Sequence, residues 1–446
     1  MTASLWRDRR FVRFWTGQTV SQFGDRVSEL AVPLIAVGTL HATAAQVARL
    51  TALAWTPNLL AVFLGAWVDR RPGERALMVA ADLVRAALLL TLPLAALAGA
   101  VTLGQLYAVA LLTGLAGVVF GTAYSSFFPR LVPPPSYVDA NSKLSASCSA
   151  SFVAGPALGG GLVQLLTAPV AVAVDAVSFL VSALLVGRVH ADEPRVTGRP
   201  DGPALLRGAR EGLAFVVRHP VLRPTLACAT TLNFFTFLTG TGLLVLFADR
   251  ELGLSPGVIG LAFGAGAIGG LLGAVAAPAI SRAIGVGRSV AVGAVLFPAP
   301  FALVWAAEGP PWARAGVLAA AELLSSFGVM LFDVNLNSLQ TAVVPDGLRS
   351  RVAGAYSTVN YGVRPLGALV GGALATLVGL RPTITVAAVG GALSLLWLLP
   401  SPIPGTRTLD DIAVVAPGPP GRGPRPPPRR PAPPRGAPGR GGIKNR

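Results

Sequence analysis

Charged side chains lie inside the first long apolar segment of this sequence, where a charge is energetically costly. Asp25, Arg26 and Glu29 fall near the middle of residues 14–39, and the two acids share a helix face because they are four residues apart. A charge in a membrane span costs roughly 2.5–3.5 kcal/mol on insertion scales. Nearby carboxylates, or one in a poorly hydrated cavity, bind protons more readily. The three residues are therefore proton-coupling candidates, and the alternative is a satisfied pair with Arg26 or another base such as Arg85.

Other polar and aromatic side chains in apolar segments could line a substrate cavity. Residues 323–340, LLSSFGVMLFDVNLNSLQ, are rich in them, and polar groups that converge in an apolar pocket orient a ligand. Our cavity candidates are Asn58, Tyr124, Asn233, Phe237, Asp333, Asn335 and Tyr361. Aromatic residues such as those of NFFTF (233–237) also serve as packing or lipid contacts. Asp82 and Arg85 are three residues apart and predict a local ion pair, while Asp175 and Arg364 are ambiguous.

A short charged stretch, GAWVDRRPGERALM (65–78), separates two apolar segments. It contains Gly65, Asp69, Arg70, Gly73 and Arg75. A topological anchor of basic residues would explain the arginines but neither the acid nor Gly65. A carboxylate beside arginines makes charge-assisted hydrogen bonds, and a glycine lets a neighbouring backbone approach.

A second motif, GPALGGGL, begins at Gly155 and also contains Pro156, Gly159 and Gly160. Glycines at this spacing let helices pack closely, and the proline weakens the backbone hydrogen-bond ladder. The segment could therefore bend or seal a cavity. The alternative is small-residue packing with no further role.

These residues must be positioned by long apolar helices. The chain has 446 residues, of which 53% are hydrophobic and 13% are charged, whereas soluble domains carry about a quarter charged residues. A span needs about 20 apolar residues, and the runs are too long and uniform for barrel strands. We predict twelve spans, at 14–39, 47–68, 76–98, 103–126, 144–166, 169–187, 223–247, 257–281, 288–306, 313–340, 352–377 and 381–400.

Basic residues set the expected orientation. Most Lys and Arg fall on one side of the alternating spans, and only Arg49, Arg250, Arg314 and Arg381 lie at the other. This bias follows the positive-inside rule and puts both termini in the cytoplasm of a multi-pass plasma-membrane protein. We expect no cleavable signal peptide. The net charge of +16 therefore indicates membrane topology, and we expect a lipid bilayer and no nucleic acid as the partner.

The chain divides into two similar halves. GPALGGGL (155–162) resembles RPLGALVGGAL (364–374), and LVP (131–133) resembles VVP (343–345) at a similar offset. Similar offsets indicate a duplicated six-helix unit. We expect an all-α integral membrane protein of two pseudo-symmetric six-helix bundles, residues 1–187 and 223–400, joined by a cytoplasmic linker, 188–222.

The tail, residues 401–446, becomes rich in proline, arginine and glycine. Residues 417–446 contain no acid and almost nothing apolar, so we expect disorder. The tail is either solvated or in contact with anionic lipid headgroups.

The charged stretch at 65–78 resembles the loop that is usually written GxxxDRxGRR in the major facilitator superfamily. Its spacing departs from that pattern, because Arg71 and Pro72 replace one residue and Glu74 precedes the expected arginine. The resemblance implies a cytoplasmic gate at Gly65, Asp69, Arg70, Gly73 and Arg75, and a first helix that lines the cavity. GPxxGG resembles the motif of proton-exchanging exporters. Residues 111–128 lack the buried arginine of many such antiporters, so proton coupling would need another basic partner.

The resemblance, closest to bacterial drug and siderophore exporters, implies a secondary transporter that works by alternating access. We expect proton-coupled efflux of a small amphipathic organic molecule by a monomer. Uptake of an organic solute is the alternative, and a non-transporting membrane protein or enzyme is the competing class. No phosphate loop, HExxH or GxSxG motif is present, so we expect neither an enzyme nor a cofactor or metal.

Overall fold

The computed structural model describes residues 5–69, 71, 73–133, 136–189, 202–345, 348–409 and 411. All regular structure in this part of the chain is helical. The α-helices are α1 (Arg9–Leu34), α2 (Ala44–Trp55), α3 (Ala61–Asp69), α4 (Glu74–Leu97), α5 (Leu103–Leu131), α6 (Tyr137–Leu165), α7 (Ala168–Gly187), α8 (Gly202–Arg218), α9 (Leu222–Arg250), α10 (Pro256–Ile284), α11 (Val286–Leu296), α12 (Pro311–Val343), α13 (Arg349–Gly362), α14 (Arg364–Val378) and α15 (Leu380–Ala392). Short helical turns extend or join them, including η2 (Ile35–Thr39), η3 (Thr56–Leu60), η5 (Ala299–Ala306) and η7 (Leu393–Trp397).

Ten helical segments in the described ranges are long and apolar enough to cross a membrane. They correspond to the third to twelfth predicted spans. The remaining two predictions fall on α1 with η2, which carries several charges, and on α2, η3 and α3, which are short pieces. The prediction of an all-helical, multi-span membrane protein is confirmed.

Two of the predicted spans are interrupted. Pro57 lies in η3, in the middle of 47–68, and 352–377 is divided into α13 and α14 just before Pro365. Proline has no backbone N–H to donate, and its ring clashes with the preceding turn. These breaks place backbone irregularities in the second and eleventh predicted spans, one in each half of the chain.

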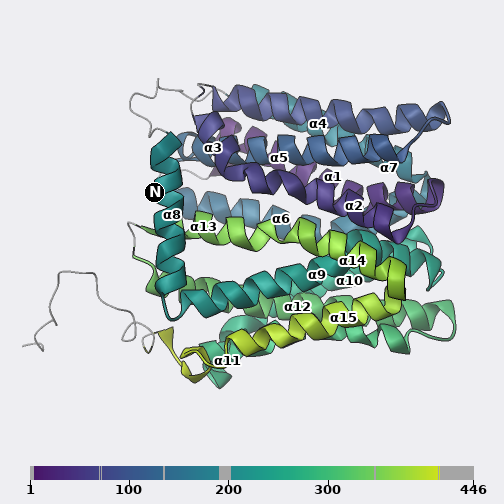
Figure 1. Cartoon of the computed structure of the whole chain (residues 1–446). Helices are drawn as coiled ribbons and strands as arrows, with labels where there is room; N and C mark the ends of the chain where they lie inside the picture. Colours follow the sequence, from purple (N-terminus) through teal and green to yellow (C-terminus); the bar gives the residue numbers. More distant parts are fainter. Residues whose placement is uncertain are drawn as a thin grey trace, which may run out of the picture.

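Most helices run side by side, and α8 lies across one end of the bundle (Figure 1). We call this the α8 end and the opposite one the far end. The N-terminal half, up to Gly187, meets the C-terminal half, from Leu222, chiefly where α6 packs on α10 and α2 packs on α14.

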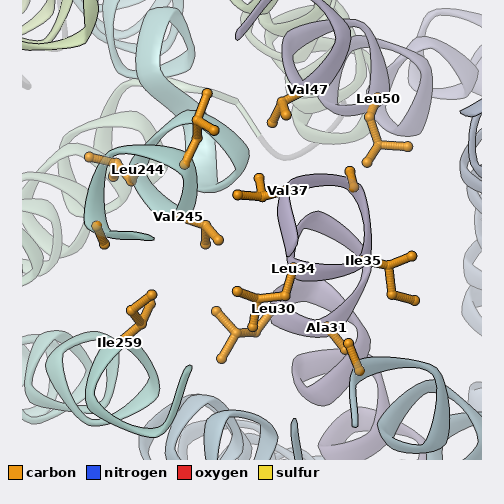
Figure 2. Packing of buried hydrophobic residues seen from close by; sticks show 14 of the residues in the cluster. Leu30, Ala31, Leu34, Ile35, Val37, Val47, Leu50, Leu244, Val245 and Ile259 are labelled. Carbon is orange, nitrogen blue, oxygen red and sulfur yellow. The ribbon is translucent and has the colours of Figure 1, made fainter. Parts of the chain in front are cut away.

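A buried apolar cluster joins the two halves. Leu30 and Leu34 of α1 and Val47 of α2 lie with Leu244 of α9 and Ile259 of α10, and each is at most 7% exposed. Figure 2 shows these side chains between the helices. Van der Waals packing of this kind stabilises contacts between membrane helices, so the cluster holds the halves together toward the far end.

Candidate functional site

Three carboxyl groups surround one guanidinium in the N-terminal half. Arg85 of α4 donates from Nη2 to Asp25 of α1 over 3.1 Å. Asp82 of α4 and Asp175 of α7 are each 1% exposed, and both lie close enough to interact electrostatically with Arg85 and Asp25. If all three acids were ionised, two negative charges would be left without compensation in the membrane interior, which is costly.

Hydroxyl groups stabilise the Asp175 carboxyl. Ser28 of α1 donates to Oδ2, and Ser178 donates to Oδ1 over 3.0 Å. Ser28 lies about one turn after Asp25 and directly before Glu29 on α1, so α1 links Asp175 to the candidate pair found in the sequence.

The expected local pair between Asp82 and Arg85 is wrong, because Arg85 reaches across to α1 instead. Its guanidinium carbon lies 4.2 Å from the centre of the Phe179 ring. It also lies beside Gly117 of α5, where an added Cβ would be 3.4 Å from Nη2. Arg85 thus brings a positive charge against the 111–128 stretch of α5, which contains no arginine.

Glu29 has a different partner from Asp25. Arg26 donates to Glu29 over 2.6 Å, and its guanidinium carbon lies 3.8 Å from the centre of the Phe152 ring. The pairings that the sequence left as alternatives, with Arg26 and with Arg85, therefore both occur. They leave Asp82 and Asp175 as the acids of this region for which the described residues provide no ion pair.

Two cavities open beside these charges. One, of about 290 Å³, is lined by Asp25, Glu29, Arg85 and Asp175 and extends to α2, α5 and α9. The other, of about 520 Å³, lies between α1 and α6 of the N-terminal half and α9, α10 and α12 of the C-terminal half. Glu29 and Thr241 line both cavities, so the acid cluster and the interface cavity are neighbours.

The interface cavity contains an acid that the sequence reasoning missed. Glu322 of α12 is part of its lining. The signal was available, because Glu322 and Asp333 are the two acids of the predicted span 313–340.

The predicted gate lies at the α8 end. Gly65 and Asp69 belong to α3, but the side chain of Asp69 and all of Arg70 lie outside the described residues. Gly73 caps α4 with a φ of 90°, a left-handed conformation that favours glycine. Arg75 donates to the carbonyl oxygens of Gly187 (3.3 Å) and Val189 (3.0 Å), and so ties the start of α4 to the end of α7.

Glu74, the acid by which this loop departs from the family pattern, forms an ion pair. Glu74, at the first position of α4, accepts from Arg130 of α5 over 2.6 Å, and its side chain is 3% exposed. Replacing the arginine of the family pattern by an acid therefore creates a buried ion pair between α4 and α5.

The GPxxGG segment lies between α1 and α10. An added Cβ on Gly155 or Gly159 would meet Arg26 Cβ at 2.3 Å or Val27 Cα at 3.1 Å. On Gly160 it would lie 2.5 Å from the carbonyl oxygen of Pro256 and 2.8 Å from Gly260 Cα. On Gly260 it would lie 2.4 Å from the carbonyl oxygen of Pro156. The motif therefore lets α6 and α10 approach backbone to backbone near the far end.

The matching segment of the C-terminal half makes the equivalent contact. An added Cβ on Gly372 of α14 would lie 2.3 Å from Ala48 Cβ of α2. Glycines from both copies of the repeated motif thus lie where the halves meet.

Three cavity candidates gather around Arg364. Its Nε donates to Asn233 Oδ1 over 2.8 Å. Its guanidinium carbon lies 4.8 Å from the ring centre of Phe237 and 4.2 Å from those of Tyr361 and of Trp55, from the other half. Such cation–π contacts stabilise a partly buried arginine. Phe237 also lines the smaller cavity.

The remaining candidates make local or packing contacts. Asn58 donates to the Trp55 carbonyl (3.2 Å), and Tyr124 lies in an aromatic cluster with Phe14 and Phe128. Asn335 is 3% exposed and accepts from Ser281 (2.5 Å), which joins α12 to α10. Asp333 interacts electrostatically with Arg364 without a direct ion pair in the described part of α12.

Known proteins resemble this chain along most of its length. The Tap multidrug efflux pump of Mycolicibacterium fortuitum is 29% identical over 401 residues, which cover 87% of this chain and 94% of the pump. The Tap pump of Mycobacterium tuberculosis H37Rv is 28% identical over 379 residues, which cover 82% and 87%.

Solved transporter structures have the same fold. The nucleoside transporter NupG superposes with a TM-score of 0.67 at 14% identity, with 88% of this chain and 97% of that chain covered. An inward-facing bacterial homologue of the iron transporter ferroportin has a TM-score of 0.65 at 20% identity, with 89% and 99% covered. The sequence pattern of the Major Facilitator Superfamily matches residues 14–368 and 226–435. The chain belongs to this superfamily of membrane transporters.

Proposed function

We propose that this protein is a proton-coupled exporter of small amphipathic organic molecules, such as a drug, an antibiotic or a siderophore. The observation that carries the proposal is the cluster of Asp25, Asp82 and Asp175 around the single arginine Arg85. With more acids than bases in the membrane interior, the cluster becomes less charged when it binds protons. Proton uptake and release can therefore change the packing of α1, α4 and α7.

The arrangement of the halves supports alternating access. In the proposal, the first span is α1 with η2, the second is α2 with η3 and α3, and twelve spans form two six-helix bundles in the plasma membrane. Both termini and α8 are cytoplasmic. The close contact of α6 with α10 then closes the outer side, and the cavities face inward. A monomer is sufficient for this cycle.

The residues of the proposed gate act at the cytoplasmic side. Asp69, Arg70 and Gly65 hold the halves together when the cavity faces outward and release them as it opens inward. Gly73 and Arg75 give the loop its shape, because Gly73 caps α4 and Arg75 is bonded to the end of α7.

Export rather than uptake is favoured by two observations. GPxxGG packs at the interface of the halves, and the relatives with the Tap name are described as efflux pumps. In everted membrane vesicles with an acidic interior, adding a substrate should dissipate the proton gradient. A panel of cationic, neutral and anionic lipophilic compounds that never changes the gradient would contradict proton-driven export.

A further inference from the structure

The cavity between the two halves is lined by an acid that does not belong to the cluster of carboxyl groups around Arg85. Glu322 lines the cavity from α12, opposite Arg26 and Glu29 of α1. Its Oε2 would lie 3.1 Å from a Cβ on Gly266, so the carboxyl lies beside a glycine of α10 that leaves it room. No hydrogen bond or ion pair to Glu322 occurs in the part of the chain that the structure describes.

The charges that line this cavity do not cancel. Arg26 is neutralised by Glu29 at 2.6 Å, and Glu322 is the third Asp, Glu, Lys, Arg or His side chain of the described lining. Ionised Glu322 therefore gives the cavity one net negative charge. A buried carboxylate without a partner is unfavourable, so the cavity lacks one positive charge that a ligand can supply.

The rest of the lining suits an apolar molecule. Phe152, Phe263, Leu271 and Met330 belong to it, and aromatic faces attract cations as well as apolar groups. The volume of about 520 Å³ lies within the roughly 300–1,000 Å³ typical of small-molecule sites.

We propose that the interface cavity binds a lipophilic organic cation, with the Glu322 carboxylate as the counter-ion. This inference rests on the proposed export function. It adds the chemical class of the exported substrate. Helices of both halves line the site.

The test uses two probes of the same shape and opposite charge, tetraphenylphosphonium and tetraphenylborate, with the purified full-length protein in detergent and no proton gradient. Glu322→Gln should weaken phosphonium binding by at least about tenfold, since removing one partner of a buried charge pair is costly. Glu322→Asp, which keeps the charge, should retain most of the affinity. Glu308→Gln removes an exposed loop charge and should change the affinity by less than about twofold, because such charges are screened.

A measurement on the unaltered protein covers the case in which Glu322→Gln fails to fold. A hydrophobic carbodiimide adds across the carboxylic acid to form an N-acylurea, which mass spectrometry of peptides locates. Phosphonium should protect Glu322 from this reagent, and borate should not. Equal phosphonium affinity in Glu322→Gln, or the absence of protection, would overturn the inference. Because neither assay involves proton flux, both can succeed even if the exporter proposal fails.

Discussion

Gly160 of α6 and Gly260 of α10 lie so close that a Cβ on the first would be 2.8 Å from the Cα of the second. The contact joins the two halves of the chain near the far end. The GPxxGG motif accounts for this contact, because the backbones of Pro156 and Gly160 both face α10.

Widening this contact should impair transport. Gly160→Val would force α6 and α10 apart, and such overpacking costs about 1–3 kcal/mol. We expect transport to fall by at least about tenfold. Gly161→Val is the matched control, because nothing lies within 4 Å of a Cβ there, and surface changes usually stay within about 0.5 kcal/mol. Efflux of a fluorescent substrate from cells compares the two, and equal activities would contradict a seal at Gly160.

The proposed proton coupling should depend on the acids around Arg85. Asp25→Asn removes the hydrogen-bonded partner of Arg85 and one carboxyl of the proposed coupling cluster. Gradient-driven transport should be lost, while exchange of substrate in the absence of a gradient continues. Asp139→Asn is the control, because it belongs to an exposed pair with Lys143 that contributes little. Full gradient-driven transport by Asp25→Asn would remove this acid from the proton pathway.

Ion pairs of equal length should differ in their effect on stability. The Glu74–Arg130 and Glu211–Arg351 distances are both 2.6 Å, but the Glu74 side chain is 3% exposed and that of Glu211 is 48% exposed. Glu74→Gln should destabilise the fold by about 2 kcal/mol, because it removes a hydrogen bond between two charged groups, Glu74 and Arg130. Glu211→Gln should cost less than about 0.5 kcal/mol. Thermal unfolding in detergent measures both, and equal shifts of the melting temperature would refute the distinction.

The gate assignment predicts a kinetic effect. Asp69→Asn should slow turnover without a large change in substrate affinity, because a gate residue stabilises one conformation and does not contact the ligand. Binding and transport measured on the same preparation separate the two quantities. A large loss of affinity at normal turnover would instead mean that Asp69 contacts the substrate.

Hydropathy and local motifs predicted much of the fold. The apolar runs predicted the helices, and the glycine motif predicted the close helix contact at Gly160. The breaks at Pro57 and Pro365 were less evident, since proline also occurs within the intact helix α6. Whether a proline interrupts a helix depends on what its neighbours pack against.

The candidate site was only partly accessible from the sequence. The spacing of Asp25 and Glu29 indicated proton coupling, with pairing to Arg26 or Arg85 as the alternative, and the Arg26–Glu29 pair is local. Arg85 pairs with an acid 60 positions away, which no local pattern encodes. Similarly, Asn335 resembled a cavity residue by type, but its side chain bonds to Ser281 in the packed contact of α10 and α12.

Proton flux in reconstituted vesicles tests the central claim most directly. Purified protein in proteoliposomes with an acidic interior should release protons when a substrate from the lipophilic panel is added. The same liposomes with Asp25→Asn, or without protein, should keep their gradient. Substrate movement that leaves the proton gradient unchanged in the unaltered protein would contradict proton-coupled export.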